Sequence, residues 1–314
     1  RPVVNISYAL NYAISGENVW GYHVANVAIH ALAALALLGV VRRTLASPVL
    51  RGHFGVAPGS LAFLTALLWA LHPLQTESVT CIAQRTESLC GLFYLATISC
   101  FIRATVCHPL DDKPPDRAGA VWLTLSVASS LAGMGTKEVM VTAPFMVLLY
   151  DRTFVAGSFA AAWRRRRTYY FALAGTWLLL AWLVVRSGGA RGASAGFGLG
   201  VSWWTYLLKQ SEAILLYLKL SIWPDPLVFD YGTAVVNSLA AVWWQAAMVC
   251  ALLAAAVWSL ARKPVAGFLG AWFFLILAPS SSVVPLVTQT MAEHRMYLPL
   301  AAVLSLVAVT LFGW

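Results

Sequence analysis

Apolar runs long enough to cross a bilayer recur along the whole of this 314-residue chain. Hydrophobic residues make up 60% of the sequence and charged residues only 11%, whereas a soluble domain carries about 25% charged residues. Because the bilayer core offers the backbone no hydrogen-bonding partner, such runs must form helices that satisfy their own N–H and C=O groups. We therefore predict an all-α, polytopic membrane helix bundle that forms a single domain over residues 1–314.

The hydropathy pattern predicts nine membrane crossings. They cover roughly residues 24–42, 58–72, 84–103, 118–135, 138–160, 168–186, 240–261, 265–282 and 296–314. An amphipathic stretch at 203–222 is expected to form an interfacial or re-entrant helix on the non-cytoplasmic side. A tenth crossing there would weaken the charge asymmetry between the two sides.

The net charge of +9 is explained by the loops. With nine crossings, 13 basic and four acidic residues fall on one side, and the other side carries eight of each. Since basic loops stay in the cytoplasm, the first side is predicted to be cytoplasmic, and no nucleic-acid partner is expected. The four arginines at 164–167 are expected to stop the preceding crossing and to contact lipid headgroups. The five cysteines have no CxxC spacing, and neither a metal site nor a disulfide framework is predicted.

Ionisable residues of both signs gather at the helix ends on the other, non-cytoplasmic side. On a helical wheel of residues 77–93, the polar residues fill one side. The run from Ser60 to Leu71 would reach roughly 18 Å, against about 30 Å for a hydrocarbon core, so the turn after it is expected to be recessed. Intramembrane ionisable residues mark functional sites. The candidates are His72, Glu77, Arg85, Glu87, Lys137, Glu138, Glu293, His294 and Arg295.

This set of side chains suits a substrate with a lipid tail and a phosphate head. Arginine and lysine can hold a phosphate as negative charge builds on it, and a carboxylate can take the proton of an attacking hydroxyl. That chemistry is glycosyl transfer from a polyprenyl-phosphate sugar. From the residues alone, a transporter or channel is an equally good interpretation.

Five stretches resemble the membrane region of the transmembrane and tetratricopeptide-repeat O-mannosyltransferases and their bacterial relatives, which belong to the GT-C class of glycosyltransferases. They occur in the family's order. The stretches are RPVVNISYALNYAISGENVWGYHVANVAIH, LHPLQTESVTCIAQRTESLCGLFYL, GMGTKEVMVTAPFMVLLYD, YLKLSIWPDPLVFDYG and MAEHRMYLPLA.

The resemblance implies an inverting transferase that uses a polyprenyl-phosphate-linked sugar as donor and a protein Ser/Thr hydroxyl as acceptor. It implies substrate-binding roles for His72, Glu77, Arg85, Lys137, Glu138, Glu293, His294 and Arg295. The animal pattern has arginine directly after the glutamate of the last motif, whereas here His294 stands between Glu293 and Arg295. We expect Arg85, Lys137, His294 and Arg295 to hold the phosphate.

The family's catalytic base lies in an acidic motif of the first outer loop, which would precede Arg1. We therefore expect this chain to be part of a longer protein, without the N-terminal helix, the first outer loop and any C-terminal repeats. Within the chain, Glu77, Glu87 and Glu138 are the fallback candidates for the base. No cofactor is predicted, and the expected partners are the bilayer, the lipid-linked sugar and an acceptor protein or glycan.

Two alternatives to the enzyme stay open: a transporter or flippase for a lipid-linked or anionic solute, and a non-catalytic scaffold with a transferase fold. The expected location is the bacterial inner membrane with the site facing the periplasm. The alternative location is the endoplasmic reticulum membrane with the site facing the lumen.

Overall fold

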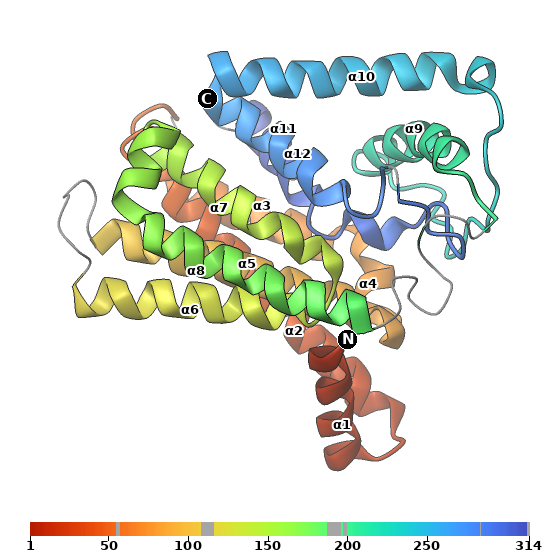
Figure 1. The fold of residues 1–314 in the computed structure, drawn as a ribbon, viewed down its shortest axis with the longest axis horizontal. Coiled ribbons are helices and arrows are strands. Elements are labelled where there is room, and N and C mark those ends of the chain that lie inside the picture. The colour runs from red at the N-terminus through yellow and green to blue at the C-terminus, as the bar shows by residue number, and fades with distance from the viewer. Residues whose placement is uncertain (55–56, 108–115, 187–195, 197–199, 283, 313–314) are drawn as a thin grey trace.

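The computed structural model describes residues 1–314 except 55–56, 108–115, 187–195, 197–199, 283 and 313–314 (Figure 1). Within the described ranges, every regular element is a helix, which confirms the all-α prediction. The longer helices are α2 (Val19–Leu45), α5 (Arg85–Cys107), α6 (Arg117–Met134), α8 (Phe159–Arg186), α9 (Trp203–Leu220) and α10 (Leu239–Arg262). The shorter ones are α1 (Pro2–Ser15), α3 (Pro58–Leu71), α4 (Thr76–Thr80), α7 (Ala143–Tyr150), α11 (Pro264–Leu277) and α12 (Leu300–Phe312).

Four helices of the described chain are long and apolar enough to cross a membrane. They cover Val19–Leu45, Ile82–Thr105, Phe159–Arg186 and Leu239–Arg262. Helices α3, α11 and α12 are apolar but only 13 or 14 residues long, which is short for a hydrocarbon core about 30 Å thick. A helical membrane protein is thus confirmed, while the nine-helix bundle stays a prediction.

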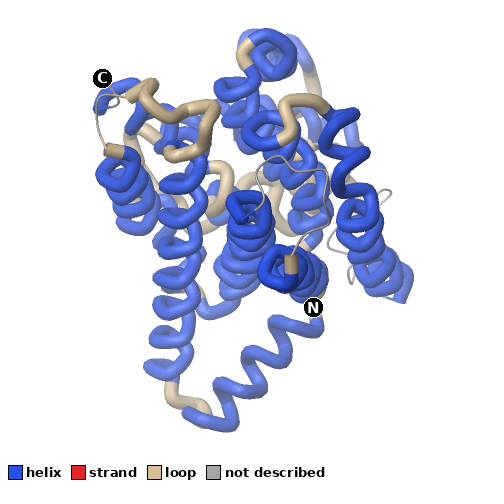
Figure 2. Tube along the Cα trace, turned by 90° about the vertical axis from the view of Figure 1, so that its left-hand side faces the viewer, coloured by secondary structure: helices blue, strands red, loops and turns tan. Residues whose placement is uncertain are grey.

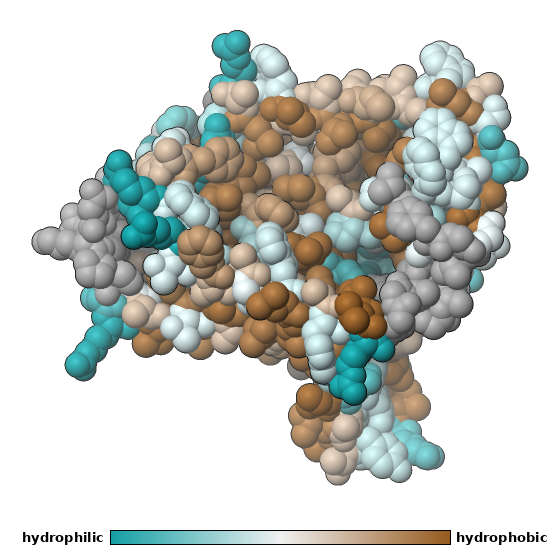
Figure 3. Space-filling view, viewed as in Figure 1, coloured by the Kyte–Doolittle hydropathy of each residue, from teal (hydrophilic) through white to brown (hydrophobic). Residues whose placement is uncertain are grey.

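The helices define two chemically different ends of the bundle. Figure 1 shows α6, α8 and α10 lying across the page, and its left-hand side is the end that we name the basic end. Hydrophilic side chains appear at that margin in Figure 3, while apolar side chains cover much of the hollowed middle of the same face. The basic end carries Arg42, Arg43, Arg51, Arg103, Arg117, Arg262 and Lys263. The opposite end, named the polar end, holds α4 and the loops before α7 and α12.

The segment predicted as one crossing at 138–160 consists of three successive helical elements of different type over residues 138–155. A 3-10 helix η3 (Glu138–Thr142) leads into α7, and a π-helical turn η4 (Asp151–Val155) follows. Pro144 lies at the start of α7 and has no backbone N–H to donate, which suits the first turn of a helix rather than its interior. Lys137, directly before η3, lies at a junction between elements rather than inside a helix.

The four arginines at 164–167 lie inside α8, which begins at Phe159 and therefore extends beyond the crossing predicted at 168–186. Arg166 has a non-helical backbone (φ −131°, ψ 24°) that kinks the helix. Its guanidinium donates to both carboxylate oxygens of Asp151 at 2.9 Å, and Tyr170 donates to the same group. An ion pair with a buried acid therefore joins this part of the basic run to η4.

Of two further helices, α9 was predicted from its amphipathic pattern and α1 was not. The stretch predicted at 203–222 forms α9, and Figure 1 shows α9 foreshortened beside α10, so the two helices are not parallel. Figure 2 shows α1 leading from the N-terminus to a short loop, after which α2 runs back along the bundle.

An aromatic core holds α2, α3 and the start of α12 together. Tyr297 donates to or accepts from His30 Nδ1 at 2.8 Å, and its carbonyl accepts from Trp69 Nε1 at 2.8 Å. His30 stacks on Trp69 with ring centroids 5.0 Å apart. Gly91 of α5 faces the Tyr297 ring, and a Cβ there would lie 2.3 Å from Cε1. The aromatic core therefore requires glycine at position 91.

We predict that Gly91→Ala destabilises the protein by about 1–3 kcal/mol, because the added methyl group displaces the Tyr297 ring. Thermal unfolding of the full-length protein in detergent measures the effect. Gly175→Ala in α8 is the matched control, since a Cβ there meets nothing within 4 Å. An unfolding temperature of Gly91→Ala equal to that of Gly175→Ala would contradict the assigned packing.

Candidate functional site

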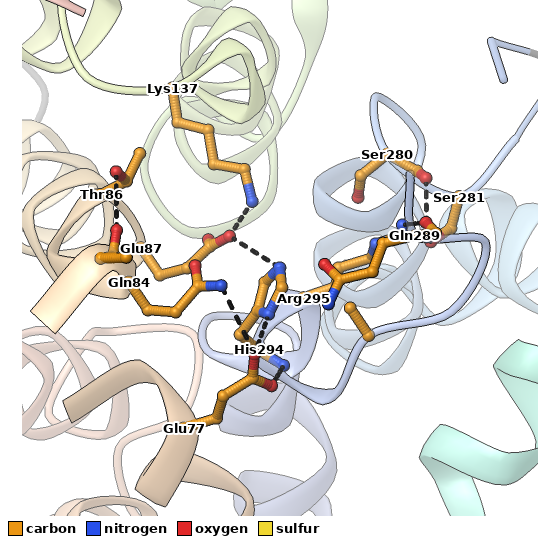
Figure 4. A network of polar contacts seen from close by, with 12 residues as sticks. Glu77, Gln84, Thr86, Glu87, Lys137, Ser280, Ser281, Gln289, His294 and Arg295 are labelled. Carbon is orange, nitrogen blue, oxygen red and sulfur yellow. Dashed lines mark hydrogen bonds and ion pairs between the residues drawn. The ribbon is translucent and has the colours of Figure 1, made fainter. Parts of the chain in front are cut away.

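Four ionisable side chains meet at the polar end and form what we name the charged cluster: Glu77, Glu87, Lys137 and His294 (Figure 4). They come from four separate parts of the chain. Glu77 lies in the five-residue α4, Glu87 in the first turn of α5 and Lys137 immediately before η3. His294 lies in the 3-10 helix η6 (Glu293–Met296). The cluster therefore joins segments that are far apart in sequence, as predicted for these residues.

Hydrogen bonds and close ionic contacts link the four side chains of the charged cluster. Glu77 Oε1 accepts from His294 Nδ1 at 2.6 Å, and Glu77 Oε2 accepts from the His294 backbone N–H at 3.1 Å. The other imidazole nitrogen of His294 lies 3.6 Å from Glu87 Oε1, which also pairs with Lys137. None of the four side chains is more than 10% exposed. Such burial is tolerated because each charge has a partner of opposite sign or a hydrogen bond.

The local sequence explains why Glu77 leaves the preceding helix. Proline at 73 disfavours helical backbone in the residue before it, and α3 ends at Leu71 with His72 extended (φ −66°, ψ 133°). The His72 side chain then accepts from the Leu74 backbone N–H at 3.2 Å and begins the 3-10 helix η1 (Pro73–Gln75). Helix α4 follows and presents Glu77 to η6.

The helical wheel predicted for residues 77–93 is wrong, because these residues do not form one helix. Cys81 has an extended backbone (φ −75°, ψ 114°), and the 3-10 helix η2 (Ile82–Gln84) separates α4 from α5. Glu77 and Glu87 still meet, because His294 lies between them rather than because they share a helix face. Gln84 adds a bond of 3.4 Å to Glu77 from η2.

The space between the charged cluster and Arg295 is small. A cavity of about 10 Å³ is lined by Glu87, Cys90, Lys137 and Arg295, together with residues of the loop before α12. This volume suffices for about one water molecule. Ligand sites for small molecules measure about 300–1,000 Å³, so this arrangement is a closed one.

Arg295 lies beside this cavity, but its hydrogen bonds go to neutral oxygens. Its Nη1 donates to the carbonyls of Ser280 and Thr290 at 3.1 Å each and to the Tyr206 hydroxyl at 3.2 Å, and its Nη2 donates to the carbonyl of Gln289. No carboxylate of the described chain bonds to it. Arg295 therefore organises the 280–290 loop and leaves a positive charge next to Lys137.

Arg85 faces away from the charged cluster, so the structure does not bring it together with Lys137 as predicted. Its Nε donates to Asn26 Oδ1 at 2.6 Å, and its Nη2 donates to Asn11 Oδ1 at 2.7 Å and to the Tyr22 carbonyl at 3.1 Å. The guanidinium also lies 4.6 Å from the centroid of the Tyr8 ring. Since α1 and α2 supply these neutral partners, Arg85 joins both helices to the start of α5.

The remaining predicted residues border the charged cluster. Glu293 Oε1 accepts from the Val228 backbone N–H and from the Tyr231 hydroxyl, each at 2.7 Å, and so fastens the loop after α9 to η6. Burial, with Glu293 beside it, raises the pKa of Tyr231 above its ordinary value. His72 Nε2 lies 3.2 Å from the carbonyl of Ser221 at the end of α9. Glu138 is half-buried and begins η3.

Sequence reasoning did not identify Asn11 and Asn26 as the partners of Arg85. Their only signal was polar residues on otherwise apolar helices, since Asn26 is fully buried and Asn11 is 7% exposed. In the described ranges, no group of three or more His, Cys, Asp or Glu side chains is placed to hold a metal ion.

The burial of His294 decides its protonation. Burial lowers the pKa of His294, and the charges of Lys137 and Arg295 lower it further, while the hydrogen bond to Glu77 acts in the opposite direction. The imidazole is therefore neutral at pH 7 and donates its Nδ1–H to Glu77. The unfolded chain binds the His294 proton with the ordinary pKa of about 6.5, whereas the folded protein binds it only at lower pH. As the pH falls below about 6.5, protonation therefore favours the unfolded state, and the folding stability is reduced.

We predict that His294→Asn reduces the acid sensitivity of the fold. The free energy of unfolding of the unmodified protein should fall between pH 7 and pH 5, and that of His294→Asn should fall less, since one histidine that must be buried neutral is gone. Thermal unfolding over this pH range measures the slope. His53→Asn, an exposed histidine at the basic end, serves as the control and should keep the original slope. Parallel slopes for all three proteins would show that His294 is not buried as a neutral group.

Comparison with curated proteins identifies relatives that are named protein O-mannosyl-transferases. TMTC2 of Mus musculus is 37% identical over 103 residues, which are 33% of this chain and 11% of that protein. TMTC1 of Mus musculus is 32% identical over 151 residues, which are 48% of this chain and 15% of that protein. Tmtc2 of Drosophila melanogaster is 27% identical over 278 residues, which are 85% of this chain and 28% of that protein.

These relatives confirm the resemblance predicted from the five sequence stretches. The chain spans less than a third of the length of the curated relatives it matches. No family model and no solved structure matches the chain.

Proposed function

We propose that the protein is a membrane glycosyltransferase that moves a sugar, mannose in the first instance, from a polyprenyl-phosphate donor to a hydroxyl of an acceptor protein. The observation that carries the proposal is the charged cluster, in which a lysine and a histidine are held by two carboxylates at the recessed polar end. The names of the relatives, protein O-mannosyl-transferases, support the same reaction class.

In this reaction the acceptor oxygen forms a bond to the anomeric carbon, on the face opposite the phosphate. The bond between that carbon and the phosphate oxygen breaks, and its electron pair stays on the phosphate. The hydroxyl proton passes to a carboxylate base, and polyprenyl phosphate leaves. Single displacement of this kind inverts the anomeric configuration.

The charged cluster suits the phosphate side of the reaction. Lys137 already binds an oxyanion, the Glu87 carboxylate, and would exchange it for the donor phosphate. An anion next to His294 would favour its imidazolium form, so His294 would add a positive charge to that of Lys137 when the donor binds. Arg295, whose charge is not balanced by a carboxylate of the described chain, would add to the field without changing its hydrogen bonds.

The closed cavity of about 10 Å³ implies that donor binding separates Glu87 from Lys137. Glu77 and Glu87 are engaged by His294 and Lys137, which places them better for holding the phosphate-binding groups than for taking a proton from the acceptor. We therefore assign neither of these two carboxylates as the catalytic base. The reaction would take place on the non-cytoplasmic side.

We predict that Lys137→Met lowers kcat by about 10²-fold, the usual loss when one donor to a developing oxyanion is removed. The assay measures transfer of mannose from polyprenyl-phosphate mannose by the full-length protein in detergent. Lys209→Met is the matched control, since Lys209 also forms a lysine–glutamate pair at 2.6 Å, with Glu212 of α9, outside the charged cluster.

Thermal unfolding of both variants checks that the fold is intact. Transfer by Lys137→Met at the rate of Lys209→Met would contradict the assigned role of Lys137. Failure of the unmodified full-length protein to transfer any sugar would contradict the proposed function and favour a scaffold.

A further inference from the structure

We propose that the basic end carries a second lipid site, which binds one acyl chain of a phospholipid with an anionic headgroup. The site is a cavity of about 770 Å³ between α2, α7, α11 and α12. It lies at the end opposite the charged cluster and plays no part in the reaction proposed above. Its size falls within the range of 300–1,000 Å³ that is usual for ligand sites.

The walls of the cavity are mainly apolar and come from α2, α3, α7, α11 and α12, from the loop after α2 and from η4. Leu37 and Val40 line it from α2, Phe154 from η4, and Phe268 and Leu269 from α11. A chain of methylene groups is the ligand chemistry that such walls favour, at about 0.8 kcal/mol for each buried CH₂.

Small residues keep the cavity open on the side of α12. Ala301, Ala302 and Ser305 line it within little more than one helical turn, where larger apolar residues would fill the space. The Ser305 hydroxyl is satisfied by the carbonyl of Ala301 at 2.6 Å, so it presents no free donor to an apolar ligand.

The opposite wall is held in place by the close packing of α11 against α10. A Cβ at Gly267 would lie 2.3 Å from the backbone N of Leu260, and a Cβ at Gly270 would lie 2.7 Å from the Ala256 Cβ. Because small residues let the two helices approach this closely, α11 is fixed on α10 and keeps its distance from α2. The cavity is therefore a preformed feature of the bundle.

The rim of the cavity is polar and positively charged. Thr44, His53 and Lys263 line it, and the Thr44 hydroxyl bonds to the Tyr150 hydroxyl at 2.9 Å. Arg43 and Arg262 are the sequence neighbours of Thr44 and Lys263. In the described parts of the chain, neither Lys263 nor these two arginines forms an ion pair with a carboxylate. A positive rim above an apolar cavity complements an anionic headgroup with its acyl chain below.

The test uses the full-length protein in detergent and native mass spectrometry. Phosphatidylglycerol and phosphatidylcholine with identical acyl chains are added in equal amounts. We expect the protein to retain phosphatidylglycerol in preference to phosphatidylcholine. Lys263→Ala should bind phosphatidylglycerol roughly fivefold more weakly, the effect of one cation near an anionic headgroup. Arg117→Ala, which removes an exposed cation of the basic end outside the cavity, should bind like the unmodified protein.

A second variant blocks the cavity itself. Ala266 lines the cavity and is exposed, so Ala266→Phe should fill it and lower the retention of both lipids. Ala266→Leu is the milder form, for use if the phenylalanine prevents folding.

Equal retention of the two lipids by the unmodified protein, or lipid binding that neither Ala266 variant changes, would overturn the proposal. Cross-linking of a protein segment to Ala266→Cys, with no lipid retained, would also overturn it and assign the cavity to a protein helix. The readout does not depend on sugar transfer.

Discussion

The contact between Glu77 and His294 is the interaction on which the polar end depends. One carboxylate accepts from both the backbone N–H and the imidazole of a residue 217 positions away. A buried carboxylate without a partner costs several kcal/mol. Separation of α4 from η6 would leave Glu77 in that state, so each element depends on the other. Glu87 and Lys137 extend the same network to α5 and to the segment before α7.

The two buried arginines are accommodated in a different way. Arg85 and Arg295 bond to carbonyls, amides and hydroxyls, and in the described ranges neither bonds to a carboxylate. Neutral oxygens satisfy the guanidinium N–H groups but leave the charge itself unbalanced. Each of the two guanidinium groups is therefore a source of positive potential at the polar end, which would attract the anionic phosphate of the proposed donor.

The residue types of the charged cluster could be predicted from the sequence, because ionic residues are rare in apolar surroundings and stand out there. The predicted grouping of Glu77, Lys137 and His294 is what the structure shows. The contacts of Arg85 could not be predicted, since its partners are two carbonyls and two asparagines in α1 and α2, none of which is distinctive in sequence. The break at Cys81 and the change from η3 to α7 were not predicted, because apolar periodicity does not distinguish a long helix from 3-10 and α segments in series.

Every member of the charged cluster lies at a junction between elements: in a one-turn helix, at the first turn of α5, before η3 or within η6. The long helices α2, α5, α8 and α10 carry none of the group except Glu87. Widening the site thus requires changes of backbone dihedral angles in a few short segments, while the backbone hydrogen bonds of the long helices stay unchanged. The rigid part and the adjustable part of the molecule are in this way separate, and the lipid-linked donor proposed above would be admitted by movement of the short turns while the membrane-spanning helices stay folded.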